Sequence, residues 1–415
     1  MARALIIGAG MTGLASAWYL QEYGYDVEVV DRIGVAAGSS WGNAGWLAPG
    51  KTIPLAHPSL WGYGPTALFD RHAALDVPVR IEPKLWAFVA QFMAHATPRA
   101  WNSTMASLTL ADLGALAAFD ELELAGVDAQ SIDAPFIIGF GSKREVSGFV
   151  GEIEGARRHG QDISFHEVTL EEARNDAPML TDKVEAIYRL EGQRYIEPGP
   201  YCQAIADSIE ARGGVVRSGE EVVAVQSTRK PAVKLATGQW LSADVVVIAT
   251  GAWLPQLAKD MGVGTMVQAG RGYSFSVETK QPATCPVYLP VQKVACTPYQ
   301  GRFRVAGTME FRGPDEPFQP KRVESIIHTT KPMFQGVDWD SRQDEWVGSR
   351  PVTPDGLPLV GATKLPNVYT NGGHGMWGVV LGPISGKMLA KQIATGEVDD
   401  TIKPFDPLRS PLGGL

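Results

Sequence analysis

The chain has 415 residues, 45% of them hydrophobic and 20% charged, and a formal net charge of -8. Because a single hydrophobic core stops growing at roughly 250–300 residues, this length predicts two lobes or interleaved domains. The negative charge argues against a nucleic-acid partner, since phosphate binding needs a basic face, but it allows a small anionic ligand held by one arginine. No run approaches the roughly 20 apolar residues of a transmembrane helix.

The cysteines and the N-terminus favour a reducing compartment. Cys202, Cys285 and Cys296 form no C-x-x-C pair, which predicts neither a disulfide framework nor a metal site. Only Met1 and Ala2 precede the first predicted strand, which leaves no room for a secretory leader. We therefore expect a cytoplasmic protein without a metal, and peripheral contact with the inner face of a membrane stays open.

The N-terminal residues have the pattern of a β-α-β unit. An apolar run that ends at Ile7 predicts a strand, Gly8-x-Gly10-x-x-Gly13 opens a helical pattern, and a second predicted strand ends at Asp31. Such glycines let a pyrophosphate approach the helix N-terminus, and an acidic residue about 20 positions later accepts hydrogen bonds from ribose hydroxyls. This context predicts a dinucleotide site.

The same kind of pattern returns in the middle and at the end of the chain. A helix is predicted over 198–212, a strand buried on both faces over 244–249, and a strand, glycine turn and helix over 368–396. Between these segments, short strands such as 273–277 and 303–306 favour a mixed or antiparallel sheet.

We therefore predict an α/β protein, α+β overall, with a discontinuous Rossmann-like domain and an inserted substrate domain built on a mixed or antiparallel sheet plus helices. The predicted boundaries are 1–50, 160–265 and 345–415 for the dinucleotide domain, and 51–159 and 266–344 for the substrate domain.

Two later motifs favour FAD over NAD. Thr250-Gly251 follows the buried strand, and a glycine turn from Asn371 to Gly375 leads into the C-terminal helix. A helix N-terminus near the pyrimidine edge of a flavin stabilises the anionic reduced ring, whereas NAD needs no such distant contact. Because Cys296 is expected to be a buried, inert thiol, the FAD is predicted to be non-covalent.

Six motifs extend this pattern along the chain: Gly8–Gly13, Ser39–Gly45, Arg271–Ser274, Arg304–Glu310, Arg350–Gly356 and Gly373–Gly375. In this order they resemble the D-amino-acid oxidase-like FAD oxidoreductases, and especially bacterial D-amino-acid dehydrogenases and glycine or sarcosine oxidases. The resemblance covers nearly the whole chain. The family often has Glu at the position of Asp31, which has the same charge.

The glycine turn and the resemblance together imply a set of cofactor contacts. They fall on Gly8, Gly10, Met11, Thr12, Gly13, Asp31, Arg32, Ser39, Ser40, Asn43, Ala44, Gly45, Val223, Thr250, Gly251, Gly373, His374, Gly375 and Met376.

Three residues are candidates for the substrate site. Arg350 matches the family's carboxylate-binding arginine, and a guanidinium pairs with a carboxylate in bidentate fashion; a surface ion pair is the alternative. Tyr273 matches a region where relatives place a tyrosine over the substrate, with a buried strand residue as the alternative. His374 is expected to support the loop beside the flavin, and no side chain is assigned as catalytic.

The resemblance implies oxidative deamination of an amino acid, and of a D-amino acid in particular. Hydride passes from Cα to flavin N5, the imino acid is hydrolysed to a 2-oxo acid and ammonia, and oxygen or a quinone-type acceptor takes the electrons. Two alternatives stay open. One is oxidation of secondary amines such as sarcosine-, glycine- or proline-like substrates, and the other is a non-catalytic flavin-binding or electron-transfer protein.

Overall fold

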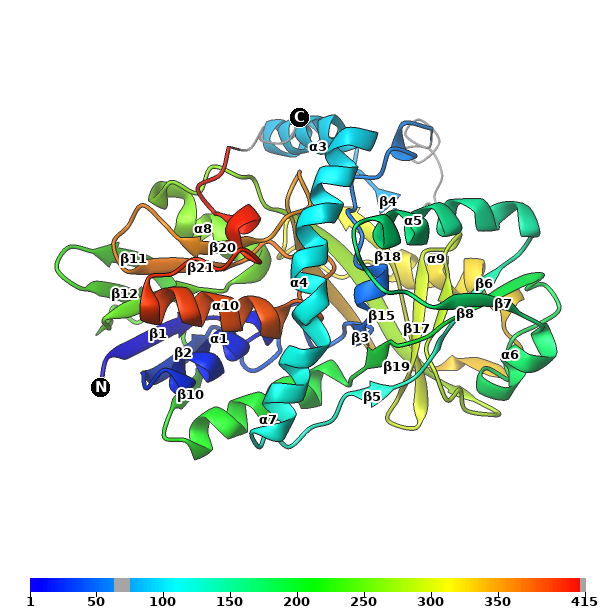
Figure 1. Cartoon of the computed structure of the whole chain (residues 1–415), viewed down its shortest axis with the longest axis horizontal. Helices are drawn as coiled ribbons and strands as arrows, with labels where there is room; N and C mark the ends of the chain where they lie inside the picture. The colour runs from blue at the N-terminus through cyan, green and yellow to red at the C-terminus, as the bar shows by residue number, and fades with distance from the viewer. Residues whose placement is uncertain (63–74, 411–415) are drawn as a thin grey trace.

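Two large sheets organise the computed structural model, which describes residues 1–62 and 75–410 (Figure 1). The strands of the first lie at the left of Figure 1 and those of the second at the right, with a long central helix, α4 (Pro98–Leu124), between them. The predicted fold class is confirmed: a Rossmann-like sheet is combined with a mixed, largely antiparallel one. Within the described residues, no helix has the length and apolar content needed to cross a membrane.

The first sheet has six strands, parallel except for the antiparallel pair β21 and β20. In spatial order they are β10 (Val215–Ser218), β2 (Asp26–Asp31), β1 (Arg3–Ile7), β14 (Val245–Ile248), β21 (Val368–Gly372) and β20 (Leu359–Ala362). A three-stranded meander covers one face: β11 (Val222–Ser227), β12 (Pro231–Leu235) and β13 (Trp240–Ser242).

The second sheet has nine strands. They are β19 (Val337–Val352), β15 (Gln268–Thr279), β18 (Arg302–Phe311), β17 (Val294–Tyr299), β16 (Val287–Leu289), β6 (Phe136–Phe140), β8 (Ala186–Leu190), β7 (Phe165–Val168) and β4 (Leu75–Asp76), which pairs with β18. A small sheet of β3 (Trp46–Leu47), β9 (Arg194–Tyr195) and β5 (Ile132–Asp133) completes the strands described.

The helices surround these sheets. Besides α4, they are α1 (Met11–Glu22), α3 (Pro83–His95), α5 (Val146–Arg158), α6 (Leu170–Asp176), α7 (Pro198–Ala211), α8 (Leu254–Ala258), α9 (Pro320–Thr330) and α10 (Gly382–Thr395).

The continuous apolar run of β14 has a direct structural reason. Val247 packs into the core formed with the helices on one face of the sheet, whereas Val246 and Ile248 pack under the meander on the other face. A strand covered on both faces cannot alternate polar and apolar residues. The predicted helix over 198–212 corresponds to α7, and the predicted strand over 273–277 lies within β15.

The predicted domain boundary at residue 160 does not follow the sheets. β7 and β8 lie inside the segment predicted for the dinucleotide domain, yet β8 pairs with β6 in the nine-stranded sheet. Strand pairing is decided by tertiary packing, and the local sequence of a strand does not name its partner. The nine-stranded sheet therefore takes strands from both sides of that boundary.

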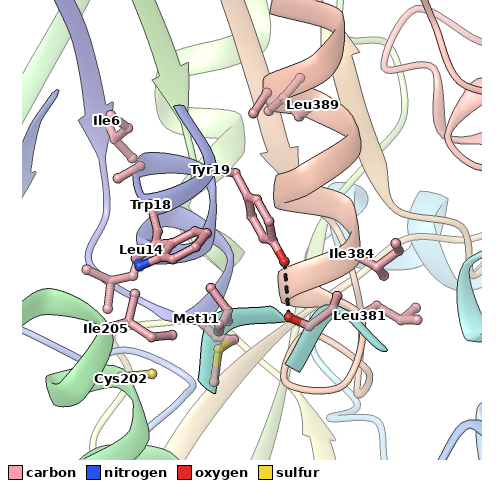
Figure 2. Close-up of a cluster of buried hydrophobic side chains, with 14 of the residues drawn as sticks. Ile6, Met11, Leu14, Trp18, Tyr19, Cys202, Ile205, Leu381, Ile384 and Leu389 are labelled. Carbon is pink, nitrogen blue, oxygen red and sulfur yellow. Dashed lines mark hydrogen bonds between the residues drawn. The ribbon is translucent and has the colours of Figure 1, made fainter. Parts of the chain in front are cut away.

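The core beside the first sheet is built where α1 packs against α7 and α10 (Figure 2). Leu14 and Trp18 of α1 lie near Ile205 of α7, and Met11 lies near Leu381 at the start of α10. Tyr19 donates a hydrogen bond to the carbonyl oxygen of Ala118 in α4 at 3.0 Å. These contacts fix the position of the N-terminus of α1.

Two glycines of α10 permit its close approach to α1. A Cβ added at Gly382 would lie 2.7 Å from Cγ of Met11, and one added at Gly386 would lie 2.8 Å from the backbone nitrogen of Ser16. Contacts this short leave no space for a side chain: Gly386 lies against the backbone of α1, and Gly382 lies against the side chain of Met11.

We predict that Gly386→Ala lowers the free energy of unfolding by about 1–3 kcal/mol, because the added methyl group forces α1 and α10 apart. Urea unfolding should show this loss. The matched control is Gly151→Ala in α5, where an added Cβ meets no atom within 4 Å and should stabilise the helix by about 0.5–1 kcal/mol. Equal stabilities for the two variants would mean that α10 is free to shift.

Candidate functional site

A cavity of about 300 Å³ lies between the two sheets. Its floor is the carboxyl edge of the first sheet, including the turns after β1, β2 and β14, and its opposite wall includes Val347, Ser349 and Arg350 of β19. The glycine turn before α10 closes a third side. Ligands of open α/β sheets bind at this edge, outside the carboxyl ends of the strands.

The turn between β1 and α1 requires glycine. Gly8 has φ of +111°, and a Cβ there would lie 2.5 Å from the carbonyl oxygen of Ala249. A Cβ on Gly13 would lie 1.9 Å from the carbonyl oxygen of Gly8. Gly10 is the N-cap of α1 and provides no side-chain cap; Ser40 Oγ accepts from the Met11 N–H at 3.2 Å, and the other N–H groups of the first helical turn are available for an anion in the cavity.

Asp31 organises the same turn from the end of β2. Its Oδ2 accepts a hydrogen bond from the backbone N–H of Ala9 at 2.9 Å, and its Oδ1 accepts from those of Ile33 and Gly34 at 2.8 and 2.9 Å. Oδ2 has a second lone pair that accepts from no described residue, so Asp31, which lines the cavity, keeps one acceptor for a hydroxyl group. The sequence predicted the role of Asp31 as an acceptor for hydroxyl groups and missed its hydrogen bonds to the backbone of the turn.

Most of the predicted cofactor residues line the cavity. Those in its wall are Gly8, Gly10, Met11, Thr12, Asp31, Arg32, Ser39, Ser40, Asn43, Thr250, Gly251, His374, Gly375 and Met376.

The other five predicted contacts lie outside the wall. Gly13 packs behind the glycine turn, and Gly373 is a turn residue with φ of +71°. Gly45 lies against the carbonyl oxygen of Ile196, and the Ala44 carbonyl accepts a hydrogen bond from Thr297. Val223 is exposed on the meander at an irregularity in the pairing of β11 with β12, whereas its neighbour Val222 lines the cavity.

The rim beside Arg32 contains residues that sequence reasoning missed. Asp315, in the loop after β18, accepts hydrogen bonds from Arg32 Nη2 at 2.9 Å and from Trp253 Nε1 at 3.0 Å. The Arg32 guanidinium also lies 4.1 Å from the ring centre of Trp253. An acidic residue in a loop carries no local signal for such a contact, which joins segments from distant parts of the chain.

Arg350 presents a cation to the cavity. Its Nη1 donates to the carbonyl oxygen of Thr308 at 3.1 Å, and within residues 1–62 and 75–410 it forms no ion pair with a carboxylate. Burial lowers the pKa of its guanidinium to about 10, which leaves the group charged at neutral pH. A half-buried cation without a counter-ion favours an anionic ligand at this place.

Tyr273 lies away from the cavity. Its ring is fully buried in the core of the nine-stranded sheet, and its hydroxyl donates to Glu310 Oε1 at 2.5 Å. Glu310 in turn pairs with Arg312 at 2.9 Å and with Arg322 at 3.3 Å. This geometry fits the alternative prediction for Tyr273, a buried strand residue whose hydroxyl is hydrogen-bonded, and not a tyrosine placed over the substrate.

His374 is buried and neutral. Its Nε2 lies 3.1 Å from Ser385 Oγ, and Ser385 donates its own hydrogen to the carbonyl oxygen of Gly382 at 3.0 Å. The serine oxygen therefore accepts from Nε2–H, which fixes the tautomer. Burial lowers the pKa of His374 to about 3, so the side chain is a poor base at neutral pH.

The whole chain is similar to known proteins. The family profile that matches residues 3–392 is described as "FAD dependent oxidoreductase". A protein named D-amino acid dehydrogenase from Vibrio vulnificus (strain YJ016) is 29% identical, with 98% of this chain and 99% of that protein covered. A protein of the same name from Xanthobacter autotrophicus is 30% identical, with coverage of 94% and 95%.

Solved structures share the fold. Glycine oxidase from Geobacillus kaustophilus superposes with a TM-score of 0.74 at 19% identity and covers 99% of this chain and 100% of its own. L-proline dehydrogenase from P. horikoshii gives a TM-score of 0.69 at 17% identity, with coverage of 98% and 97%.

The buried His374 predicts a pH dependence of stability. Because its folded-state pKa is depressed from 6.5 to about 3, the unfolded chain binds more protons between these values, and stability is lost as the pH falls below 6.5. Between pH 7 and pH 5 this loss is about 2 kcal/mol for one histidine. Urea unfolding of His374→Gln should show a smaller drop over this interval than the wild type. An identical drop in both proteins would assign the acid sensitivity to other groups.

Proposed function

Because the chain belongs to the DAO family of FAD-dependent oxidoreductases, we propose that it oxidises the Cα–N bond of an amino acid, and of a D-amino acid in particular. The observation that supports this proposal is the Arg350 guanidinium, a cation in the cavity wall without a carboxylate partner in the described part of the chain. An amino acid supplies the missing carboxylate. Relatives named D-amino acid dehydrogenase favour the D configuration.

FAD is the cofactor of this family, as the sequence predicts. The residues at the nucleotide end suit it: N–H groups of the first turn of α1 after Met11 for the pyrophosphate, a glycine turn that a Cβ would block, and the Asp31 carboxylate for a ribose hydroxyl. All three described cysteines are buried, and none lies in the cavity wall, which supports non-covalent binding.

The side chains around Arg350 would orient the substrate and exclude water. Arg350 would hold the carboxylate and so fix the direction of the Cα–H bond, while Val347, Pro351 and Met376 provide an apolar surface. The bound flavin supplies the hydride acceptor. His374 in the cavity wall would stay neutral and would be a poor acceptor for a proton of the substrate, so we propose that the substrate binds with its nitrogen deprotonated.

We further assign the first sheet and its helices to FAD binding and the nine-stranded sheet to substrate binding. Water would hydrolyse the released imino acid to a 2-oxo acid and ammonia, and oxygen or a quinone-type acceptor would take up the electrons. A panel of D-amino acids, L-amino acids and secondary amines, each added anaerobically to the yellow protein, tests the substrate class by bleaching of the flavin.

We predict that Asp31→Ala weakens FAD binding roughly 10- to 100-fold, because hydrogen bonds to a charged acceptor contribute about 1.5–3 kcal/mol. Fluorescence titration of the apoprotein with FAD gives the dissociation constant, and the fold should persist when FAD is saturating. The matched control is Asp26→Ala, an exposed residue at the other end of β2. Equal dissociation constants for both variants would remove Asp31 from the cofactor site.

We predict that Arg350→Ala lowers kcat/KM for an amino acid roughly 100- to 1000-fold, because loss of one partner of a buried charge pair costs about 3–5 kcal/mol. Arg350→Lys should be intermediate, since lysine keeps the charge without the planar pair of donors. The flavin spectrum should stay normal.

Two controls sharpen this test. The decarboxylated amine should be nearly indifferent to the substitution, and Arg342→Ala, which removes an arginine of the same strand that is paired with Glu324 and Glu345, should leave both substrates unaffected. Wild-type reduction of Arg350→Ala by an amino acid would place the carboxylate elsewhere. Equal losses for both substrates would make Arg350 a structural residue.

A further inference from the structure

The guanidinium of Arg350 rests on a position without a side chain. A Cβ added at Gly272 of β15 would lie 2.2 Å from Cζ, 2.2 Å from Nη2 and 2.4 Å from Nη1 of Arg350. These nearly equal distances mean that the Cβ would strike the face of the planar group. Because β15 is paired with β18 on one side and β19 on the other, its backbone has no room to retreat. Any residue except glycine at 272 would therefore displace the guanidinium.

The neighbouring strand contains a bulge at the same level. Arg271 pairs with Glu310 and Tyr273 with Gly307, so both Thr308 and Met309 lie opposite Gly272. Thr308 has φ of +55°, a conformation that is costly for a β-branched residue, by about 1–3 kcal/mol. Bulges beside active sites redirect groups of the chain.

The strain at Thr308 is not offset by its own side chain. Its Oγ1 is buried and has no hydrogen-bond partner, whereas its carbonyl oxygen accepts from Arg350 Nη1 at 3.1 Å. The contact that the bulge creates is therefore the one with Arg350. No described residue accepts from Nε or Nη2 of Arg350, so that edge of the guanidinium is free for both oxygens of a carboxylate.

We infer that Gly272 and the carbonyl of Thr308 form a seat for Arg350 that aims its Nε–Nη2 edge at the substrate carboxylate. This inference rests on the proposed function. Gly272 is thus a positioning residue that determines the preference for amino acids over simple amines. A displacement of about 1 Å at a reacting group costs on the order of 100-fold in rate, so the seat matters even though it touches no substrate.

The test compares Gly272→Ala with Gly270→Ala in the FAD-loaded protein. Gly270 lies on the same strand two residues away and is also crowded, but its Cβ would meet Val352 and Met309 rather than Arg350. The rate of anaerobic flavin reduction is measured against the concentration of the best amino acid of the panel and of its decarboxylated amine. The seat predicts a 10- to 100-fold rise in the apparent dissociation constant of the amino acid for Gly272→Ala alone, with the amine unaffected.

The same two substitutions are repeated in the Arg350→Ala background. Arg350→Ala removes the three atoms nearest to the added methyl group, so Gly272→Ala should have little further effect there, and a Gly272→Ala protein that fails to fold should be rescued. Suppose that Arg350→Ala is impaired but that Gly272→Ala and Gly270→Ala have the same apparent dissociation constant for the amino acid. This result overturns the seat and leaves the proposed function intact. If Arg350→Ala is reduced by the amino acid as fast as the wild type, the proposed function is overturned. A crystal structure of Gly272→Ala then tests the seat by itself. A guanidinium of Arg350 that still donates to the Thr308 carbonyl contradicts the seat.

Discussion

The site depends on backbone contacts that only glycine permits. Gly13 lies on the Gly8 carbonyl and Gly386 lies on the backbone of Ser16, so α1 is held between β1 and α10 without intervening side chains. Because α1 cannot shift, its N-terminus stays at the carboxyl edge of the sheet, next to the Asp31 carboxylate. A helix N-terminus binds an anion well only where its direction is fixed, and here packing fixes it.

In the second wall of the cavity, a glycine gives space to a charged side chain, that of Arg350. Gly272 removes the side chain that would push Arg350 away, and the Thr308 bulge supplies one acceptor and no counter-charge. A carboxylate in place of that carbonyl would neutralise the guanidinium and compete with an anionic ligand. The nearby carboxylate of Glu310 is instead held by Tyr273, Arg312 and Arg322 in the core. The sheet thus keeps Glu310 away from Arg350 at the cavity.

The sequence predicts those parts of the site that depend on local geometry. The β-α-β unit, the glycine turn and Asp31 follow from short-range rules, because a pyrophosphate turn needs its glycines and its acidic residue at fixed spacing. Asp315 and Trp253 were missed because their contact with Arg32 joins three distant segments. Tyr273 shows the opposite limit: the motif places it on the correct strand, but the face of the sheet that its side chain occupies is decided by the packing of β15 in the core.

The two walls are also joined directly, and this has a consequence for binding. Ser39 donates to the carbonyl oxygen of Ser349, Ser349 donates to that of Pro314 at 2.9 Å, and Asp315 reaches across to Arg32. Ser39 and Arg32, two of the predicted cofactor contacts, and the strand of Arg350 therefore belong to one hydrogen-bonded wall. A half-buried cation such as Arg350, which has no counter-ion among the described residues, lowers the stability of the free protein. An anion that neutralises this cation removes the destabilisation and therefore binds more tightly.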